Sequence, residues 1–229
     1  MKLAFLVFVV LTVGLLAFSS YQGLFIAPTE RTMGEVQRIF YYHVPSAWTA
    51  AVCFFVNFLA SAAYLWERNT ASDAVAAASA EVGVMFCTIV LITGPIWARP
   101  VWGIWWTWDA RLTTTLVLWL IYVSYLVLRR FAAGGQTQVL AASLAVFGFL
   151  DVPIVYMSIR WFRTQHPSPV MGGGENSGLD PAMLHAFLWS LVAFTCVGVV
   201  LMVLRYRLQR LEEKVEAAHA ALALQGGAQ

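Results

Sequence analysis

The chain has little charge. Only 11% of its 229 residues are Asp, Glu, Lys or Arg, whereas 60% are hydrophobic. An ordinary soluble domain is about 25% charged and about 45–50% apolar. This deficit places the chain in the membrane class before any motif is considered. The formal net charge of +2 is too small to indicate a nucleic-acid partner.

Cysteine is also scarce, and its spacing excludes the common metal and redox motifs. Cys53, Cys87 and Cys196 each lie inside an apolar run, and no two of them form a CxxC pair. A zinc or iron–sulfur site therefore has no support, and the three thiols are interpreted as small buried hydrophobes. The chain also lacks a Walker phosphate-binding motif, so by itself it is not an ATPase. It contains no internal repeat.

Long hydrophobic runs, in contrast, are abundant. A helix needs about 20 apolar residues to cross a bilayer, and such runs must be helical because backbone polar groups cannot stay unpaired in lipid. The predicted spans are about 3–20, 46–66, 79–97, 112–130, 138–158 and 182–204. The sequence therefore predicts an all-α membrane protein, a single domain formed by a bundle of six transmembrane helices. The first run also resembles a signal peptide, but its length favours an uncleaved anchor.

Six spans place both termini on one side of the membrane and the loops 21–45, 98–111 and 159–181 on the other. Eight Lys and Arg residues lie on the side of the termini and six, all of them Arg, on the loop side. Positive residues concentrate on the cytoplasmic side, so both termini are predicted to be cytoplasmic. The charged tail, 205–229, is predicted to continue the last helix there. The six outer arginines are either interfacial anchors or ligands for carboxylates.

Three features that bear on function share this predicted outer face. His43 lies in FYYHVPSAW, where the second span enters the membrane and Pro45 is expected to open the helix. His185 lies four residues after Pro181, about one turn inside the sixth span. The third feature is the tryptophan-rich loop WGIWWTWDARLTTT, residues 102–115. A histidine at a membrane interface often only caps a helix or bonds a carbonyl, but neutral imidazole is also a standard axial ligand of haem iron.

The tryptophan density favours a ligand. Trp and Tyr are enriched at every membrane interface, yet five tryptophans within residues 97–108 exceed what anchoring needs. Haem is a flat apolar macrocycle with two carboxylate tails, so its binding requires an axial nitrogen, aromatic surface and arginine. The predicted site residues are His43 and His185, as axial ligands of the iron, with Trp97, Trp102, Trp105, Trp106, Trp108, Asp109, Arg99 and Arg111.

Four ionisable residues leave alternatives open. Asp109 is predicted to cap the helix that starts near Arg111 or to pair with that arginine, which itself is either a propionate ligand or an interfacial anchor. Asp151, inside the fifth span, is costly in lipid and therefore a functional candidate, or else part of a hydrogen-bonded kink at Pro153. His166 is interpreted as an ordinary loop histidine, with a haem-side or partner-side role as the alternative.

The string WGIWWTWDARLTT resembles the WWD signature of the membrane proteins that handle haem in cytochrome c biogenesis. Within that group the chain resembles the CcmC haem exporter family over nearly its whole length. The resemblance is carried by GEVQRIFYYHVPSAW, TGPIWARPVWGIWWTWDARLT and IRWFRTQHP.

The resemblance implies a haem-binding and transfer protein rather than an enzyme, with haem b as its cargo. It implies that haem is held at the outer face of the bacterial inner membrane, along the tryptophan segment, with His43 and His185 serving the iron. It further implies delivery to the haem chaperone CcmE and assembly with CcmD and the ABC transporter subunits CcmA and CcmB. The competing interpretations are a b-type cytochrome, which would place paired histidines in the middle of spans, and a permease, which would need a charged central pathway.

Overall fold

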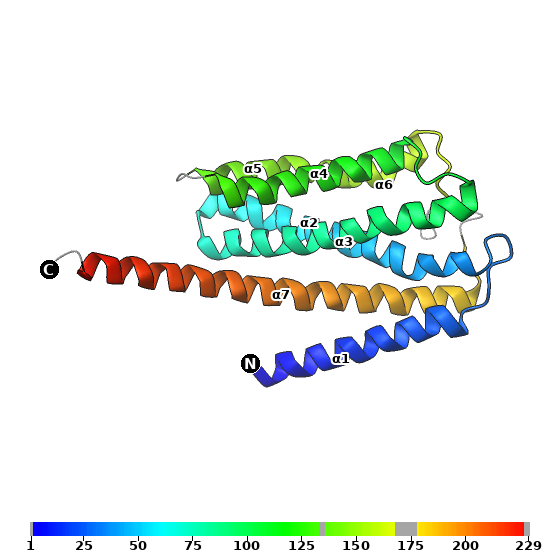
Figure 1. The fold of residues 1–229 in the computed structure, drawn as a ribbon, viewed down its shortest axis with the longest axis horizontal. Coiled ribbons are helices and arrows are strands. Elements are labelled where there is room, and N and C mark those ends of the chain that lie inside the picture. Colours follow the sequence, from blue (N-terminus) through cyan, green and yellow to red (C-terminus); the bar gives the residue numbers. More distant parts are fainter. Residues whose placement is uncertain (1, 133–135, 168–177, 227–229) are drawn as a thin grey trace.

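The computed structural model describes residues 2–132, 136–167 and 178–226. Within these ranges the apolar runs form six helical segments that are long and apolar enough to cross a membrane. Figure 1 shows the long helices packed side by side with roughly parallel axes. The prediction of an all-α membrane protein with six spans is therefore confirmed.

In the described residues, seven α-helices and two short turns make up these spans. They are α1 (Lys2–Tyr21), a π-helical turn (Gln22–Ile26), a 3₁₀ turn (Glu35–Ile39), α2 (Phe40–Glu67), α3 (Thr70–Trp102), α4 (Ala110–Phe131), α5 (Thr137–Gly148), α6 (Asp151–Trp161) and α7 (Pro181–Gly226). Helices α5 and α6 together form the fifth span. The break between them has a local cause, because Pro153 has no N–H to donate to the Phe149 carbonyl. That carbonyl accepts instead from the N–H of Val152 at 3.1 Å.

Two of the predicted spans start later in the sequence than the helices that contain them. Helix α2 starts at Phe40 rather than at 46, so Pro45 lies inside the helix and does not open it. Helix α3 starts at Thr70 rather than at 79, because the alanine-rich segment before the apolar run also forms helix, and Asn69 caps it by accepting from the N–H of Ala71 at 2.8 Å. Both helices therefore reach beyond the apolar stretches from which they were predicted.

The third boundary affects the functional site directly. Helix α3 continues to Trp102, so Arg99 and Trp102 belong to its last turns, after Trp97, and not to a loop. The connection to α4 is only 103–109. The two prolines in this part of α3 did not end the helix, as Pro and Gly are tolerated in membrane helices.

The connections lie at two opposite ends of the bundle (Figure 1). The end that carries segments 22–39, 103–109 and 162–167 is called the loop end. The opposite end, where α1 begins and α7 ends, is called the terminal end. Both termini thus lie at one end of the bundle and the three loop segments at the other (Figure 1), as expected for six spans. The continuation of α7 into the charged tail is also as predicted, while 227–229 lie outside the described residues.

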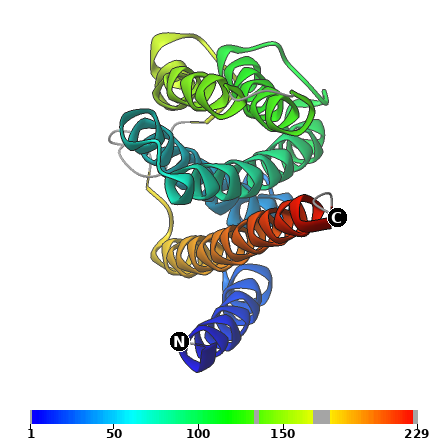
Figure 2. The same ribbon diagram turned by 90° about the vertical axis from the view of Figure 1, so that its left-hand side faces the viewer.

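The packed core lies between α2, α3, α4, α5 and α7. Phe54 of α2 stacks on Tyr122 of α4 with ring centroids 3.8 Å apart. Close helix approach depends on glycine, because a Cβ on Gly83 would meet the Phe54 ring at 2.5 Å and one on Gly198 would meet Thr49 at 2.6 Å. Helix α1 lies outside this core and packs along α7, as Figure 2 shows.

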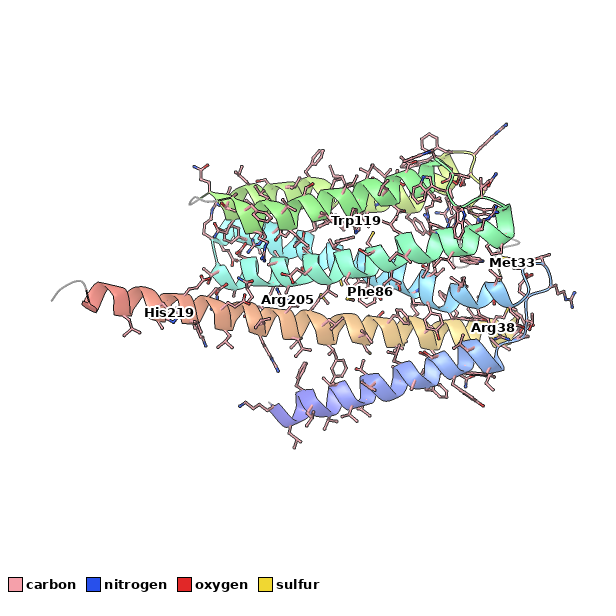
Figure 3. The ribbon with its side chains drawn as sticks, in the orientation of Figure 1. Met33, Arg38, Phe86, Trp119, Arg205 and His219 are labelled. Atoms are coloured by element: carbon pink, nitrogen blue, oxygen red, sulfur yellow. The ribbon has the colours of Figure 1, made fainter. Side chains whose placement is uncertain are left out.

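Ion pairs join helices at the terminal end. Arg129 of α4 donates to Asp73 of α3, with Nη2 at 2.8 Å from Oδ2, and both side chains are largely buried. Arg205 of α7 donates to Glu81 of α3 at 2.7 Å, and Figure 3 labels Arg205 where α7 runs along the bundle. Glu81, the acidic residue near the start of the predicted third span, therefore has a partner.

Candidate functional site

A glycine turn at the end of α3 positions the tryptophan-rich segment. Gly103 has φ of +81° and donates its N–H to the Arg99 carbonyl at 3.0 Å. Because glycine has no Cβ, it takes this left-handed conformation at little cost and ends the helix. The Arg99 guanidinium donates in turn to the Gly103 carbonyl. Arg99, predicted as a carboxylate ligand, therefore also closes the turn from which the loop starts.

The tryptophans after this turn divide into exposed and half-buried rings. Trp105 and Trp108 are 59% and 76% exposed, while Trp106 packs edge-on against Trp108 with centroids 5.7 Å apart. Within the described residues, the buried indole N–H groups of Trp97 and Trp106 have no acceptor. A buried donor without a partner costs about 1–3 kcal/mol. These two N–H groups are therefore suited to an acceptor supplied by a ligand, such as a carboxylate.

Asp109 caps α4, as one of its predicted roles required. Its Oδ1 accepts from the N–H of Leu112 at 3.0 Å, a bond typical of a helix N-cap. Its Oδ2 accepts from the hydroxyl groups of Thr164 at 2.7 Å and Thr107 at 3.3 Å. Asp109 thus joins the tryptophan-rich loop to the segment after α6, a connection that the sequence did not reveal.

Arg111 makes contacts that neither of its predicted roles included. Its Nη1 donates to the main-chain carbonyls of Val155, and of Tyr156 at 3.3 Å, and so ties α4 to α6. A guanidinium has five N–H donors. The bonds through Nη1 therefore leave Nε and Nη2 for other acceptors. Arg111 is a structural tie between helices first, and its predicted contact with a propionate stays a prediction.

His43 is buried between α2 and α3 with its tautomer set by a neighbour. Its Nδ1 lies 2.8 Å from the hydroxyl oxygen of Thr93, and its ring lies edge-on to Trp97 at 5.8 Å. The Thr93 hydroxyl already donates its proton to the Ile89 carbonyl at 2.7 Å, so it accepts from Nδ1–H of His43. The lone pair of the imidazole is then on Nε2, as a metal ligand requires.

His166 lies at the same site, where sequence reasoning preferred an ordinary loop histidine. Its ring is edge-on to Trp102 with centroids 6.4 Å apart. Its main-chain N–H donates at 3.0 Å to Thr164, the residue bonded to Asp109. Its Nδ1 lies 3.1 Å from the Pro167 carbonyl, which only accepts, so Nδ1 carries the proton and Nε2 the lone pair. Burial and then the nearby Arg111 lower the pKa of His166, which favours neutral imidazole.

His185 has different neighbours. It lies in the first turns of α7, where Asp180 caps the helix, with Oδ1 accepting from the N–H of Ala182 at 2.8 Å. Its side chain is exposed, and its Nε2 accepts from the indole N–H of Trp189 at 3.0 Å. Trp189 packs in turn against Phe18 of α1, with centroids 5.3 Å apart. His185 thus contacts Trp189 of its own helix, which packs on α1. His43 and His166, in contrast, contact tryptophans of α3.

A cavity of about 360 Å³ opens between the two loops of this site. It is lined by Thr107, Asp109, Arg163, Thr164 and Gln165. Arg163, which had no separate role among the outer arginines, brings a positive charge to its wall. The sequence signal that singles out this segment is IRWFRTQHP, a stretch that carries the family resemblance without having been assigned a site residue.

Comparisons with known proteins identify relatives of the chain. A family model described as "Heme exporter protein C" matches residues 1–221. The chain is 36% identical to "Heme exporter protein C" of Bradyrhizobium diazoefficiens over 208 residues, which is 90% of this chain and 78% of the relative. It is 35% identical to the protein of that name from Escherichia coli K12 over 206 residues, or 87% and 78%. A "Putative cytochrome c biosynthesis ccmC-like mitochondrial protein" of Marchantia polymorpha is 32% identical over 163 residues, or 71% and 69%.

Proposed function

The chain belongs to the haem exporter protein C family, and on this premise we propose that it holds haem at the loop end and passes it on for cytochrome c maturation. The observation that carries the proposal is the shared environment of two imidazoles. His43 and His166 lie edge-on to Trp97 and Trp102 of the same helix. Each has its Nδ1 proton bound by an oxygen, which leaves Nε2 for iron.

We propose His43 and His166 as the axial ligands, in place of the predicted pair His43 and His185. A neutral imidazole binds iron through a nitrogen lone pair. On His185 the Nε2 lone pair accepts from Trp189, and that bond would have to break first. His185 remains the alternative second ligand, and mutation separates the two.

The carboxylate tails of haem need donors near the tryptophan surface. The unpaired indole N–H groups of Trp97 and Trp106 and the Arg163 side chain on the cavity wall are proposed for this role. Arg99 and Arg111 are proposed to bind the carboxylates as well, through the guanidinium N–H groups that do not donate to main-chain carbonyls. Charge-assisted bonds from guanidinium to carboxylate are stronger than neutral ones, so the arginines provide most of this binding.

Release is proposed to occur on the side of the exposed rings. Trp105 and Trp108 remain largely open, so one edge of a bound macrocycle would stay within reach of an acceptor protein. We propose the haem chaperone CcmE as that acceptor, with CcmA, CcmB and CcmD as further partners. This role requires the loop end to face outward from the bacterial inner membrane and both termini to be cytoplasmic.

The test is the Soret absorption of purified variants loaded with haem. His43→Ala and His166→Ala are each expected to lose or strongly shift the band, whereas His185→Ala keeps the wild-type position and yield. Loss of the band in His185→Ala together with a normal band in His166→Ala would replace His166 by His185. A wild-type band in the His43→Ala/His166→Ala double variant would contradict the site as a whole.

A further inference from the structure

A second cavity lies at the terminal end, between the start of α1 and the part of α7 that leaves the core. Its volume is about 810 Å³, within the range of about 300–1,000 Å³ that small-molecule sites occupy. It is lined by Lys2, Tyr206, Arg207, Arg210, Leu211 and Lys214. Four of these six side chains are cationic and none is acidic, so the lining favours an anion.

The two helices that form the cavity approach each other at the loop end and diverge toward the terminal end, as Figures 1 and 2 show. The guanidinium of Arg207 lies over the ring of Phe5 at 4.1 Å and links the helices there. Apolar side chains near the cavity are exposed, with Leu3 at 74% and Leu6 at 58% on α1 and Leu208 at 42% on α7. A cationic rim next to exposed apolar helix faces fits an occupant with a charged head and apolar chains.

The charges of the rim are only partly neutralised within the protein. Arg210 donates to Glu213 at 2.6 Å and to Thr70 at 3.1 Å. Among the described residues, no carboxylate pairs with Lys2, Arg207 or Lys214. Three cations therefore converge on one space without a counter-charge from the described residues.

Basic residues at one end of a membrane protein are by themselves ordinary. Arg68 and Arg130 are examples at this end, and each lies over an aromatic ring next to it in its own segment. The cavity differs because Lys2 comes from the start of the chain and its other cations come from residues 207–214. Their convergence on a shared volume indicates a binding site more than a general charge bias.

We propose that this cavity binds the phosphate headgroup of an anionic phospholipid, whose acyl chains lie along the exposed faces of α1 and α7. Polybasic segments next to a membrane helix attract such lipids. The site also has a structural consequence. Helix α1 packs on α7 and on the π-helical turn and reaches the core through Leu16, so a lipid wedged between α1 and α7 would help to hold α1 in place.

The test uses the purified full chain in a neutral detergent. Thermal unfolding is followed through exposure of the buried thiols of Cys53 and Cys87 while short-chain phosphatidylglycerol or phosphatidylcholine is added. A ligand that binds only the folded state raises the midpoint. Wild type is expected to bind phosphatidylglycerol about tenfold more tightly than phosphatidylcholine, as expected for a few basic residues near an anionic lipid.

The informative variant is Arg207→Gln/Lys214→Gln, and its matched control is Arg68→Gln/Arg130→Gln, which removes the same charge at the same end. The first is expected to lose the tenfold preference and the second to keep it. Arg207→Lys, which keeps the charge, is expected to retain it and separates charge from folding. Equal binding of both lipids by wild type, an unchanged preference in Arg207→Gln/Lys214→Gln, or equal stabilisation by inorganic phosphate would overturn the proposal.

The haem Soret band distinguishes this site from the haem site. The band is expected to be unchanged in Arg207→Gln/Lys214→Gln, because the two sites lie at opposite ends of the bundle. A failure of the lipid test therefore leaves the haem proposal intact, and the reverse also holds.

Discussion

The two ends of the bundle treat their polar groups differently. At the terminal end, charged groups are paired between helices, as in the largely buried pair of Asp73 with Arg129 and the half-buried pair of Glu81 with Arg205. At the loop end, the buried indole N–H groups of Trp97 and Trp106 have no acceptor in the described part of the chain. A buried pair that is broken costs about 3–5 kcal/mol, whereas unpaired donors are a cost already present in the fold. The ion pairs of the terminal end thus stabilise the bundle, whereas the two indole donors of the loop end remain unpaired.

The largest expected effect is on stability at the terminal end. Arg129→Gln leaves the largely buried Asp73 carboxylate without its partner, and the free energy of unfolding should fall by about 3 kcal/mol. The haem Soret band, measured well below the unfolding temperature, should not change. Loss of haem without loss of stability would show that the two ends are not independent.

The next largest effect is on haem affinity and tests the tautomer of His43. Thr93→Val removes the oxygen that accepts from Nδ1–H of His43 at nearly the same side-chain volume. Removing such a supporting bond typically weakens metal binding by about 10–100-fold. Haem titration measures the loss. Thr88→Val is a control in the same helix, since Thr88 bonds Trp119 instead, and it should leave haem affinity unchanged.

A smaller effect separates the helix cap made by Asp109 from its bond with Thr164. Asp109→Ala removes the cap of α4 and should reduce the free energy of unfolding by about 1 kcal/mol. Asp109→Asn keeps a capping oxygen but loses the carboxylate that accepts from Thr164. It should therefore keep stability yet bind haem more weakly, because Thr164 also positions His166. Equal stability loss in both variants would show that the contact with Thr164 matters more than the cap.

The smallest expected effect is the pH dependence of haem binding. Burial and the charge of Arg111 lower the pKa of His166 below its usual value of about 6.5. Because a proton on Nε2 blocks iron, binding should persist at pH 6.5 and weaken only as the pH falls through the lowered pKa. The same shift favours the neutral form in the folded state, so its contribution to stability is present above the unfolded pKa and is lost on acidification. Haem binding that is already half lost at pH 6.5 would contradict the assignment.

The fold was largely predictable from the sequence because membrane insertion is a strong constraint. An apolar run of about 20 residues has to be helical in lipid, and the alternating direction of successive spans brings His43, Trp105 and His166 to one end. The helix boundaries were less predictable. The start of α3 is rich in alanine and polar residues, so hydropathy did not include it although its helix propensity is high.

Which histidine shares the tryptophan surroundings of His43 was the part that could not be predicted. His43 and His185 were matched by depth, which sequence position gives at about 1.5 Å per residue. Rotation about the helix axis is decided by packing instead. On α7 the buried neighbour Phe187 turns toward Phe40 of α2 with centroids 4.9 Å apart, and His185 consequently points elsewhere. His166 came to the site through hydrogen bonds of Thr164, for which the sequence gives no periodic signal.

The length of α7 has a mechanical consequence. This helix runs without interruption for 46 residues from Pro181, which at about 1.5 Å per residue is about 69 Å, roughly twice the thickness of a bilayer core. Figure 3 shows His219 on the part that extends past the other helices. A continuous helix of this length acts as a lever. A partner that pulled on the protruding arm would therefore tilt the first turns of α7, where Phe187 contacts Phe40 of α2.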